Sequence, residues 1–267
     1  MRVFLILITA FALIRTDAEA GSSTVPANRF SPEDIAGFSK QIEDELAAQG
    51  AGLAIVFRSG QPRENLPDGI SYTHGAFWAH QPIETADGRT LYGYASYNLY
   101  HGVEDRRTSY LAQDWPFDFV SGDQAGEVGI IIPSPEMQRR LIQLIASPDY
   151  AALHNPDYSL ISNPHDLRYQ NCIEFLLDVI AAAAWDTSDR PQIKANLAAH
   201  FQPARIRVGF LERLFGPAVD ERVRTEDHGS RIYTATFRSL GDFMLENNLA
   251  SEVYELSANH LTGAPDA

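Results

Sequence analysis

The stretch Tyr169-Gln170-Asn171-Cys172-Ile173-Glu174-Phe175 decides the fold, because it opens a helix that is apolar on almost every side. Asn171, followed three residues later by Glu174, forms a capping-box pattern with Asn in the usual Ser or Thr position. The apolar residues continue to about Trp185, and a helix without a polar face belongs inside a domain. The sequence therefore predicts a central buried helix over 171–185 whose first turn carries Cys172.

Cys172 is the single cysteine of the chain. At a helix start, the free backbone N–H groups and the helix dipole favour a thiolate, which is a nucleophile. Free cysteine is also among the residue types most often buried in cores, so a purely structural role is the alternative. A reactive Cys172 needs a base, and the rest of the chain must supply it.

The N-terminus has the three parts of a secretory signal peptide. Arg2 supplies the positive charge, residues 3–14 form the apolar segment, and Ala18-Glu19-Ala20 matches a cleavage site before Gly21. The apolar segment is too short to span a bilayer. We therefore expect residues 1–20 to be removed and residues 21–267 to be a soluble, exported protein with no integral membrane span. The bacterial style of the signal indicates the periplasm.

The composition limits the partners of the exported chain. Of the 267 residues 45% are hydrophobic, which suffices for a core, and the net charge is −14. Nucleic acids and anionic lipids bind clustered Lys and Arg, so this balance excludes nucleic acid as a partner. The composition leaves the oligomeric state open. Residues 21–267 contain no repeat or linker, and we expect a single α+β domain.

Hydrophobic patterns predict strands before the cysteine helix and a mixture of elements after it. Three segments, 52–58, 70–80 and 91–100, form a candidate antiparallel sheet, with Asp87-Gly88 as the turn between the last two. The remaining predictions are a helix from the Ser31 cap to Gly50, an irregular aromatic segment 104–126, a strand 127–132, a helix 134–145, turns over 148–168, a helix near 191–200, an uncertain segment 204–215, a strand 231–237 and a helix 240–247.

His74 is the best-placed base among the eight histidines. It lies within the predicted strand 70–80, next to Gly75. A glycine on a rigid strand suits the close approach of another backbone or of a substrate. His74 is therefore the expected partner of Cys172.

These motifs together carry a resemblance. A strand with Tyr72-x-His74-x-Ala-Phe-Trp78, followed much later by a helix that opens Asn171-Cys172-x-x-Phe, resembles the circularly permuted papain-like superfamily. Its members include bacterial cell-wall-type amidases and relatives of lecithin:retinol acyltransferase, and their histidine strand precedes the cysteine helix. More narrowly, the signal peptide, this strand, the Tyr97–Tyr100 strand and the cysteine helix resemble the bacterial domain-of-unknown-function family 2145. The resemblance implies a permuted papain-like fold, with an antiparallel sheet packed on a central cysteine-bearing helix and extra helices.

The resemblance also implies roles for individual residues. It makes Cys172 the nucleophile and His74 the base, and it places a third polar residue on the following strand. Asn98 or His101 stands there, and Asn98 is favoured because an amide oxygen can accept from the imidazole N–H. Gln170 is a candidate oxyanion donor together with the Cys172 N–H, although an ordinary loop role explains it equally well. The helix cap Asn171 would shape the site, and Glu174 is expected to cap the helix.

Two other assignments stay open at this point. In unpermuted papain order the base would follow the cysteine, which makes His228, beside Asp227, the alternative to His74. His200 ends a predicted helix, where the dipole favours a cation without any catalytic role. The chain has no Cys-x-x-Cys or His-Glu-x-x-His spacing, so we expect no metal and no other cofactor.

The expected function is that of an exported thiol-dependent hydrolase or acyltransferase, which attacks an amide, ester or thioester and passes through an acyl-enzyme. Its substrate would be a small-molecule, peptide or lipid-like acyl compound. Trp78, Trp115 and the tyrosines of 92–100 could line an amphipathic cleft. The alternative is a papain-like scaffold without catalysis, which binds an envelope partner through its acidic surface and the aromatic segment 104–126.

Overall fold

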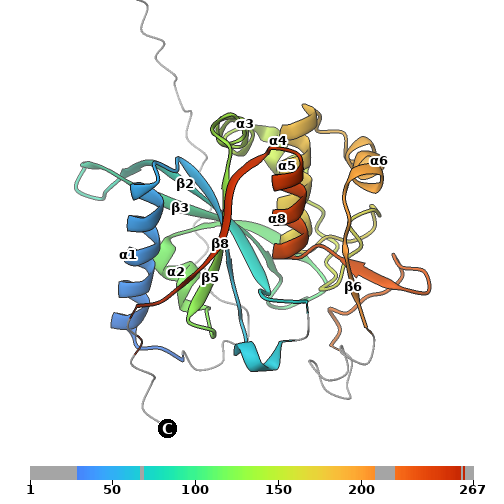
Figure 1. Cartoon of the computed structure of the whole chain (residues 1–267), viewed down its shortest axis with the longest axis horizontal. Coiled ribbons are helices and arrows are strands. Elements are labelled where there is room, and N and C mark those ends of the chain that lie inside the picture. Colours follow the sequence, from blue (N-terminus) through green and yellow to red (C-terminus); the bar gives the residue numbers. More distant parts are fainter. Residues whose placement is uncertain (1–28, 67–68, 208–219, 260, 262–267) are drawn as a thin grey trace, which may run out of the picture.

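The computed structural model describes residues 29–66, 69–207, 220–259 and 261 as a mixed α+β structure (Figure 1). The predicted signal peptide over 1–20 lies outside these residues, and so does most of the segment 204–215. A six-stranded antiparallel sheet has the strand order β4-β3-β2-β1-β5-β8. A second sheet contains only β6 and β7.

The strands of the large sheet are β1 Leu53–Arg58, β2 His74–Glu84, β3 Thr90–His101, β4 Ser109–Asp114, β5 Glu127–Pro133 and β8 Ala250–Ser257, and those of the small sheet are β6 Ala204–Ile206 and β7 Ile232–Thr234. The helices are α1 Pro32–Ala48, the short 3-10 helix η1 Arg63–Asn65, α2 Pro116–Ser121, α3 Pro135–Ile145, α4 Pro148–Ala152, α5 Cys172–Trp185, α6 Arg190–His200 and α8 Phe237–Glu246.

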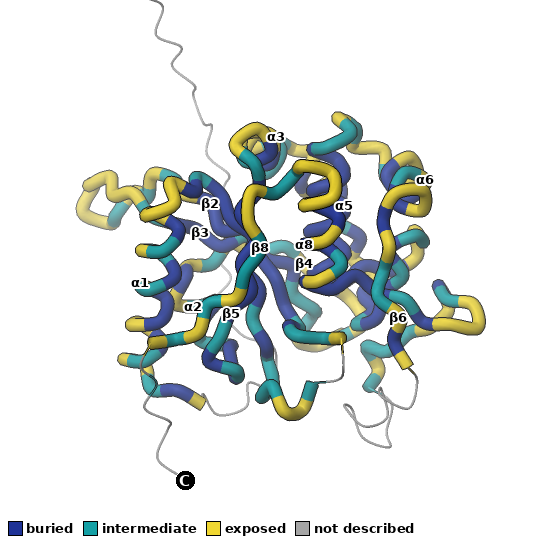
Figure 2. Tube along the Cα trace, in the orientation of Figure 1, coloured by how far each residue is buried: buried dark blue, intermediate teal, exposed yellow. Residues whose placement is uncertain are grey.

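Helices cover both faces of the large sheet (Figure 1). Successive side chains of a strand point to opposite faces. In β1 the residues Leu53, Ile55 and Phe57 pack into the cluster with α3, α5 and α8, whereas Ala54 and Val56 pack into the cluster with α1. Both faces of β1 are therefore dry, which explains why it is apolar at every position up to Arg58. The central strands are accordingly drawn as buried over most of their length in Figure 2.

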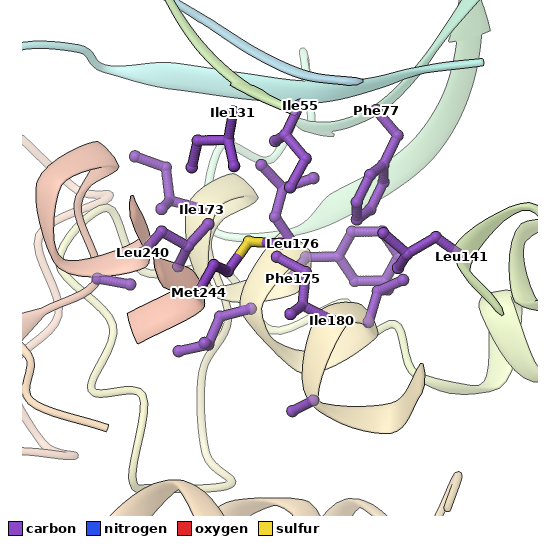
Figure 3. Close-up of a cluster of buried hydrophobic side chains, with 14 of the residues drawn as sticks. Ile55, Phe77, Ile131, Leu141, Ile173, Phe175, Leu176, Ile180, Leu240 and Met244 are labelled. Carbon is purple, nitrogen blue, oxygen red and sulfur yellow. The ribbon is translucent and has the colours of Figure 1, made fainter. Parts of the chain in front are cut away.

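Helix α5 forms the centre of the larger cluster, as its apolar sequence predicts. All its residues from Cys172 to Ala183 are buried. Figure 3 shows side chains of α5 between the strands and the neighbouring helices. The labelled residues are Ile173, Phe175, Leu176 and Ile180 of α5, Ile55, Phe77 and Ile131 of the sheet, and Leu141, Leu240 and Met244 of α3 and α8. Packing against the sheet and the neighbouring helices thus fixes the position of α5, and with it the position of its first turn.

Gly75 allows α5 to approach β2 closely. A Cβ atom at this position would lie 2.8 Å from the Leu176 Cδ1 of α5 and 2.8 Å from the Phe57 ring of β1. Such a contact is shorter than van der Waals packing tolerates, so a side chain would push α5 away from the strand. The glycine next to His74 therefore makes room for the side chains of Leu176 and Phe57, whereas the sequence predicts the close approach of a backbone or of a substrate.

Local signals in the first hundred residues predict their elements correctly. The Ser31 hydroxyl accepts a hydrogen bond from the Asp34 N–H at 3.1 Å and starts α1. Gly50 follows the helix with a φ of 64°, a left-handed conformation that costs glycine little. Gly88 has a φ of 79° in the turn between β2 and β3, and the predicted hairpin forms.

Several predictions differ from the structure. The turns predicted over 148–168 include the short helix α4, and the strand predicted over 70–80 is β2, which begins only at His74 and continues to Glu84. The segment 104–126 is not one irregular loop, because it contains the edge strand β4 and the helix α2. The predicted strand 231–237 is reduced to β7, and its last residue already begins α8. The edge strand β8 was not predicted, since its exposed and half-buried residues lack the apolar alternation of a strand with one buried face. Within the described ranges, no helix is long and apolar enough to cross a membrane.

Candidate functional site

The candidate site lies where three strands of the large sheet end. Arg58 is the last residue of β1 and pairs with His74, the first residue of β2, while β3 ends at His101. The first turn of α5 reaches the same end of the sheet, because the Cys172 thiol donates to the Thr73 carbonyl at 3.8 Å. A cavity of about 580 Å³ opens there, and its walls include all five of these residues.

Cys172 sits at the start of α5 as the capping pattern predicts. The Asn171 side-chain oxygen accepts from the Glu174 N–H at 2.9 Å, which caps the helix. The ladder between β2 and β3 begins only at Phe77 and Tyr97, so the Thr73 carbonyl is available to the thiol. Cys172 is only 5% exposed, and this exposed part belongs to the cavity wall.

The thiol of Cys172 is held neutral. Burial raises its pKa to about 11, although the backbone N–H groups of Gly75 and Ile173 and the Arg58 guanidinium favour the thiolate. The sequence predicts the opposite direction, because a helix start alone lowers the pKa of a thiol. The expectation failed since desolvation depends on tertiary packing, which buries the first turn of α5 against β2.

His74 is oriented by Asn98. Its Nε2 lies 3.1 Å from the Asn98 Oδ1. The Asn98 amide nitrogen donates to the Ser96 hydroxyl at 3.0 Å and to the Asp114 carboxylate at 3.2 Å, so the amide oxygen faces the ring. Nε2 must therefore carry the proton, and the Nδ1 lone pair is left as the basic site. Among the described residues Nδ1 has no hydrogen-bond partner, and His74 lines the cavity.

Aromatic rings hold the imidazole in place. Tyr100 stacks on His74 with ring centroids 5.0 Å apart, and Phe119 of α2 packs against it at 5.6 Å. The Tyr100 hydroxyl donates to Asp114 at 2.7 Å, so one carboxylate fixes both Tyr100 and Asn98. Burial lowers the pKa of His74 to about 3, with a further decrease caused by the Arg58 charge. The imidazole is therefore neutral near pH 7.

The thiol and the imidazole reach the cavity from different faces of the sheet. Cys172 belongs to the cluster around α5, whereas His74 contacts Phe119 of the cluster on the α1 side. In the part of the chain that the structure describes, no hydrogen bond joins the Cys172 Sγ to the His74 ring. Both side chains stand at the end of β2, and the cavity is the space that they share.

Gln170 and Asn171 occupy structural positions. The Gln170 side chain is fully buried, accepts from the Asn155 N–H at 2.8 Å and donates to Asp178 at 2.7 Å. It is not part of the cavity wall. Asn171 does line the cavity, but its amide nitrogen donates to the Leu160 carbonyl at 3.1 Å. Of the two, only Asn171 lines the cavity.

His101 and His228, the two other histidines considered for the site, are tied to protein partners. His101 lines the cavity, where its Nδ1 donates to the Gly102 carbonyl at 2.9 Å and its Nε2 accepts from Arg222 at 3.2 Å. His228, the alternative base, donates from Nε2 to the Ile161 carbonyl at 2.9 Å and is not part of the wall. His200 ends α6, as predicted. The structure thus brings His74 and His101, and not His228, to the cavity with Cys172.

Trp78 and Trp115 do not line the cavity, contrary to the prediction of an aromatic cleft that includes them. Trp78 is fully buried in the cluster with α1, and Trp115 is 42% exposed at the start of α2. Neither lines the cavity, whose aromatic residues are Tyr72, Tyr100 and Tyr158.

Glu174 does not complete the capping box. Its carboxylate is fully buried and lies 2.6 Å from the Lys194 Nζ of α6, which also contacts Asp178 at 2.7 Å. One cation therefore faces two carboxylates on successive turns of α5. Burial, together with the nearby charge of Asp178, raises the pKa of Glu174 to about 8 against the opposing effect of Lys194. This cluster fixes α5 to α6 from the first turn onward, the turn that also carries the thiol.

Arg58 is a site residue that sequence reasoning missed. It lines the cavity, and its charge acts on both Cys172 and His74. The signal that could have revealed it is the change from five apolar residues to an arginine at the end of a strand. Among the described residues, no group of three or more His, Cys, Asp and Glu side chains could hold a metal ion.

Comparison with known proteins supplies a family. No curated protein and no solved structure matches the chain. The model of the family described as "Uncharacterized protein conserved in bacteria (DUF2145)" matches residues 45–244, which run from the last turn of α1 into α8 and contain both Cys172 and His74. The match covers well over half of the chain, and the protein therefore belongs to this bacterial family.

Proposed function

We propose that this protein is a thiol-dependent hydrolase or acyltransferase, in which Cys172 forms the acyl-enzyme and His74 carries the proton. One observation supports this most strongly. The thiol at the start of α5 and an imidazole whose Nδ1 lone pair is left free by Asn98 line the same cavity. A nucleophile, a base and a group that orients the base are the parts that acyl transfer requires.

The reaction begins from the neutral thiol and the neutral imidazole. As the Cys172 sulfur bonds to the carbonyl carbon of an amide, ester or thioester, its proton passes to the His74 Nδ1. The tetrahedral intermediate then expels the leaving group, which takes this proton from His74. In the second half, His74 removes a proton from water or from another acceptor, the new bond to the acyl carbon forms, and the thioester bond breaks to restore the thiol.

This step requires a rotation of the Cys172 side chain. The thiol now donates to the Thr73 carbonyl, and a change of its χ1 rotamer would turn Sγ from that carbonyl toward the cavity. A charged pair of thiolate and imidazolium is disfavoured beforehand, because burial raises the pKa of Cys172 to about 11 and lowers that of His74 to about 3. Proton transfer is therefore expected to accompany bond formation.

The proposal extends to a permuted papain-like arrangement. The strand with His74 precedes the helix with Cys172 in sequence, an antiparallel sheet packs on that helix, and Asn98 of the next strand holds the base. We also propose that the protein is exported to the periplasm, on the signal-peptide pattern of residues 1–20. N-terminal sequencing of the protein from cells tests this, since processing should leave Gly21 as the first residue, and an intact Met1 would contradict export.

A second candidate is an envelope binding module that does not catalyse. It is favoured by the bond of the thiol to Thr73 rather than to His74, and by the burial that keeps the thiol neutral. In that case Cys172 would only pack α5 onto β2.

Acylation by 4-nitrophenyl acetate separates the two candidates. The wild-type protein should release 4-nitrophenolate in a burst that Cys172→Ala abolishes, and His74→Gln should slow the burst by about a hundredfold or more, the usual contribution of a general base. His228→Gln is the matched control, because His228 does not line the cavity. A burst that is equal in the wild-type and Cys172→Ala proteins would refute the hydrolase proposal in favour of the binding module.

A further inference from the structure

The cavity beside Cys172 is positively charged. Its walls include Arg58, Arg106 and Arg222, and no Asp or Glu of the described residues belongs to them. The two histidines in the walls, His74 and His101, add no charge, because burial lowers the pKa of both. This arrangement contrasts with the whole chain, whose net charge is −14. A cavity lined by cations inside an acidic protein selects anionic ligands, because the low-dielectric walls concentrate the field of the cations.

Two of the three arginines already have a carboxylate partner. Arg222 contacts Asp220 at 2.5 Å, and Arg106 contacts the same carboxylate at 3.5 Å. Arg58 differs from them. Within the described ranges it forms no salt bridge, although its charge acts on Asp114 and Asp123, and its Nη1 donates to the Gly122 carbonyl at 2.6 Å. Its Nε, like that of Arg106, is buried and has no hydrogen-bond partner. A buried guanidinium N–H without a partner is costly unless a ligand provides one.

The guanidinium of Arg58 is also held in place. A Cβ atom on Gly122 would lie 2.4 Å from the Arg58 Cζ, so the group packs directly on the glycine backbone. The centroid of the Phe119 ring lies 5.3 Å from the same Arg58 Cζ atom. A guanidinium fixed in this way loses little freedom when it binds a planar anion in two hydrogen bonds.

We propose that the cavity takes an acyl compound with an anionic oxygen group, a carboxylate or a phosphate, which Arg58 binds beside Cys172. The inference rests on the proposed function, because it names the substrate class of the same cavity. The pairing of β1 with β2 places Arg58 next to His74. One small substrate could therefore bind Arg58 through its anionic group and still present its carbonyl carbon to Cys172.

The test compares two alkylating reagents of almost the same shape. Iodoacetate carries a carboxylate, iodoacetamide carries a neutral amide, and both react with the Cys172 thiol. The ratio of their rate constants with the native protein is divided by the same ratio for N-acetylcysteine. This quotient does not depend on the thiolate fraction of Cys172, so a change in the thiol pKa alone leaves it unaltered. We expect a quotient of about ten or more, and saturation of the rate with iodoacetate only.

Variants assign the preference to Arg58. Arg58→Met should bring the quotient close to one, and Gly122→Ala should reduce it by displacing the guanidinium. Arg238→Met is the matched control, because this arginine is 84% exposed on α8 and outside the cavity. Competition in the wild-type protein needs no variant. Succinate or inorganic phosphate should slow alkylation by iodoacetamide, and the stronger competitor identifies the group as a carboxylate or a phosphate.

The result that refutes this inference alone differs from the result that also refutes the proposed function. If iodoacetamide modifies native Cys172 while the quotient is near one and neither anion competes, the anion site is refuted and the hydrolase proposal stands. If neither reagent modifies Cys172 before the protein unfolds in urea, the cavity is closed to ligands and both are refuted. A quotient above ten that Arg58→Met leaves unchanged would also refute the role of Arg58.

Discussion

Glu174→Gln should change how the stability of the protein depends on pH. In the native state Glu174 and Asp178 share the single cation of Lys194, and all three side chains are buried. The pKa of Glu174 is raised from 4.5 to about 8 by burial and by Asp178. The native state therefore holds this proton more tightly than the unfolded chain. The stabilisation is complete below pH 4.5 and is lost as the pH rises through about 8.

The magnitude follows from the pKa difference. At about 1.36 kcal/mol per pKa unit, the rise from 4.5 to about 8 corresponds to at most about 5 kcal/mol between acidic and alkaline pH. Glutamine has the shape of protonated glutamate, and its amide oxygen can still accept from Lys194. The variant should therefore match the wild type near pH 5 and exceed its free energy of unfolding by several kcal/mol near pH 9.

Urea unfolding of both proteins at pH 5, 6, 7, 8 and 9 measures this difference. The buried histidines contribute equally to the free energy of unfolding of both proteins, so their contribution cancels when the value of the wild type is subtracted from that of the variant. Glu252→Gln, on the exposed side of β8, controls for the loss of one carboxylate. A difference that stays flat from pH 5 to 9 would mean that Glu174 is already ionised in the native state, and it would refute the argument that burial keeps the cluster neutral.

Three further predictions concern the site and its support. Gly75→Ala should lower the free energy of unfolding by about 1–3 kcal/mol, because its Cβ would meet Leu176 and Phe57 at 2.8 Å. Gly37→Ala, which has open space on α1, should stabilise the protein slightly. Urea unfolding measures both variants, and equal effects would contradict the close packing of α5 on β2. Alkylation of Cys172 by iodoacetamide in the native protein should accelerate up to about pH 11, because burial raises the thiol pKa, and a plateau below pH 8 would reveal a preformed thiolate instead. Asn98→Ala should slow acylation by 4-nitrophenyl acetate by roughly tenfold, because His74 loses the acceptor that fixes its tautomer, and an unchanged rate would remove Asn98 from the site.

The elements predicted correctly carry their signals locally. The cap at Ser31, the left-handed Gly50 and the turn at Gly88 each depend on the backbone of a few residues. The apolar run of α5 similarly requires burial wherever the helix lies. The strand β8 carried no such signal, because it lies at the edge of the sheet with one face exposed, and only its pairing with β5 reveals it.

The proximity of the candidate residues followed from the sequence, and their electrostatics did not. Residue type and position suggested Cys172, His74 and Asn98, and the structure brings the first two to one cavity and joins the last two by a hydrogen bond. The neutral thiol depends on how deeply the first turn of α5 is buried. The link from Glu174 to Lys194 joins two residues that are 20 positions apart in sequence, on the consecutive helices α5 and α6. Both the burial of the thiol and the contact of Glu174 with Lys194 depend on tertiary packing, which a local sequence pattern does not reveal.

Intact-protein mass spectrometry tests the central claim most directly. The protein is quenched in acid at short times after mixing with 4-nitrophenyl acetate and then digested to locate the adduct. The proposal predicts one acetyl group on Cys172 in the wild-type protein, the same adduct in His228→Gln, and a much slower appearance in His74→Gln. An unmodified Cys172 in the native protein, or an adduct that forms equally fast without His74, would contradict the claim that these two residues act together.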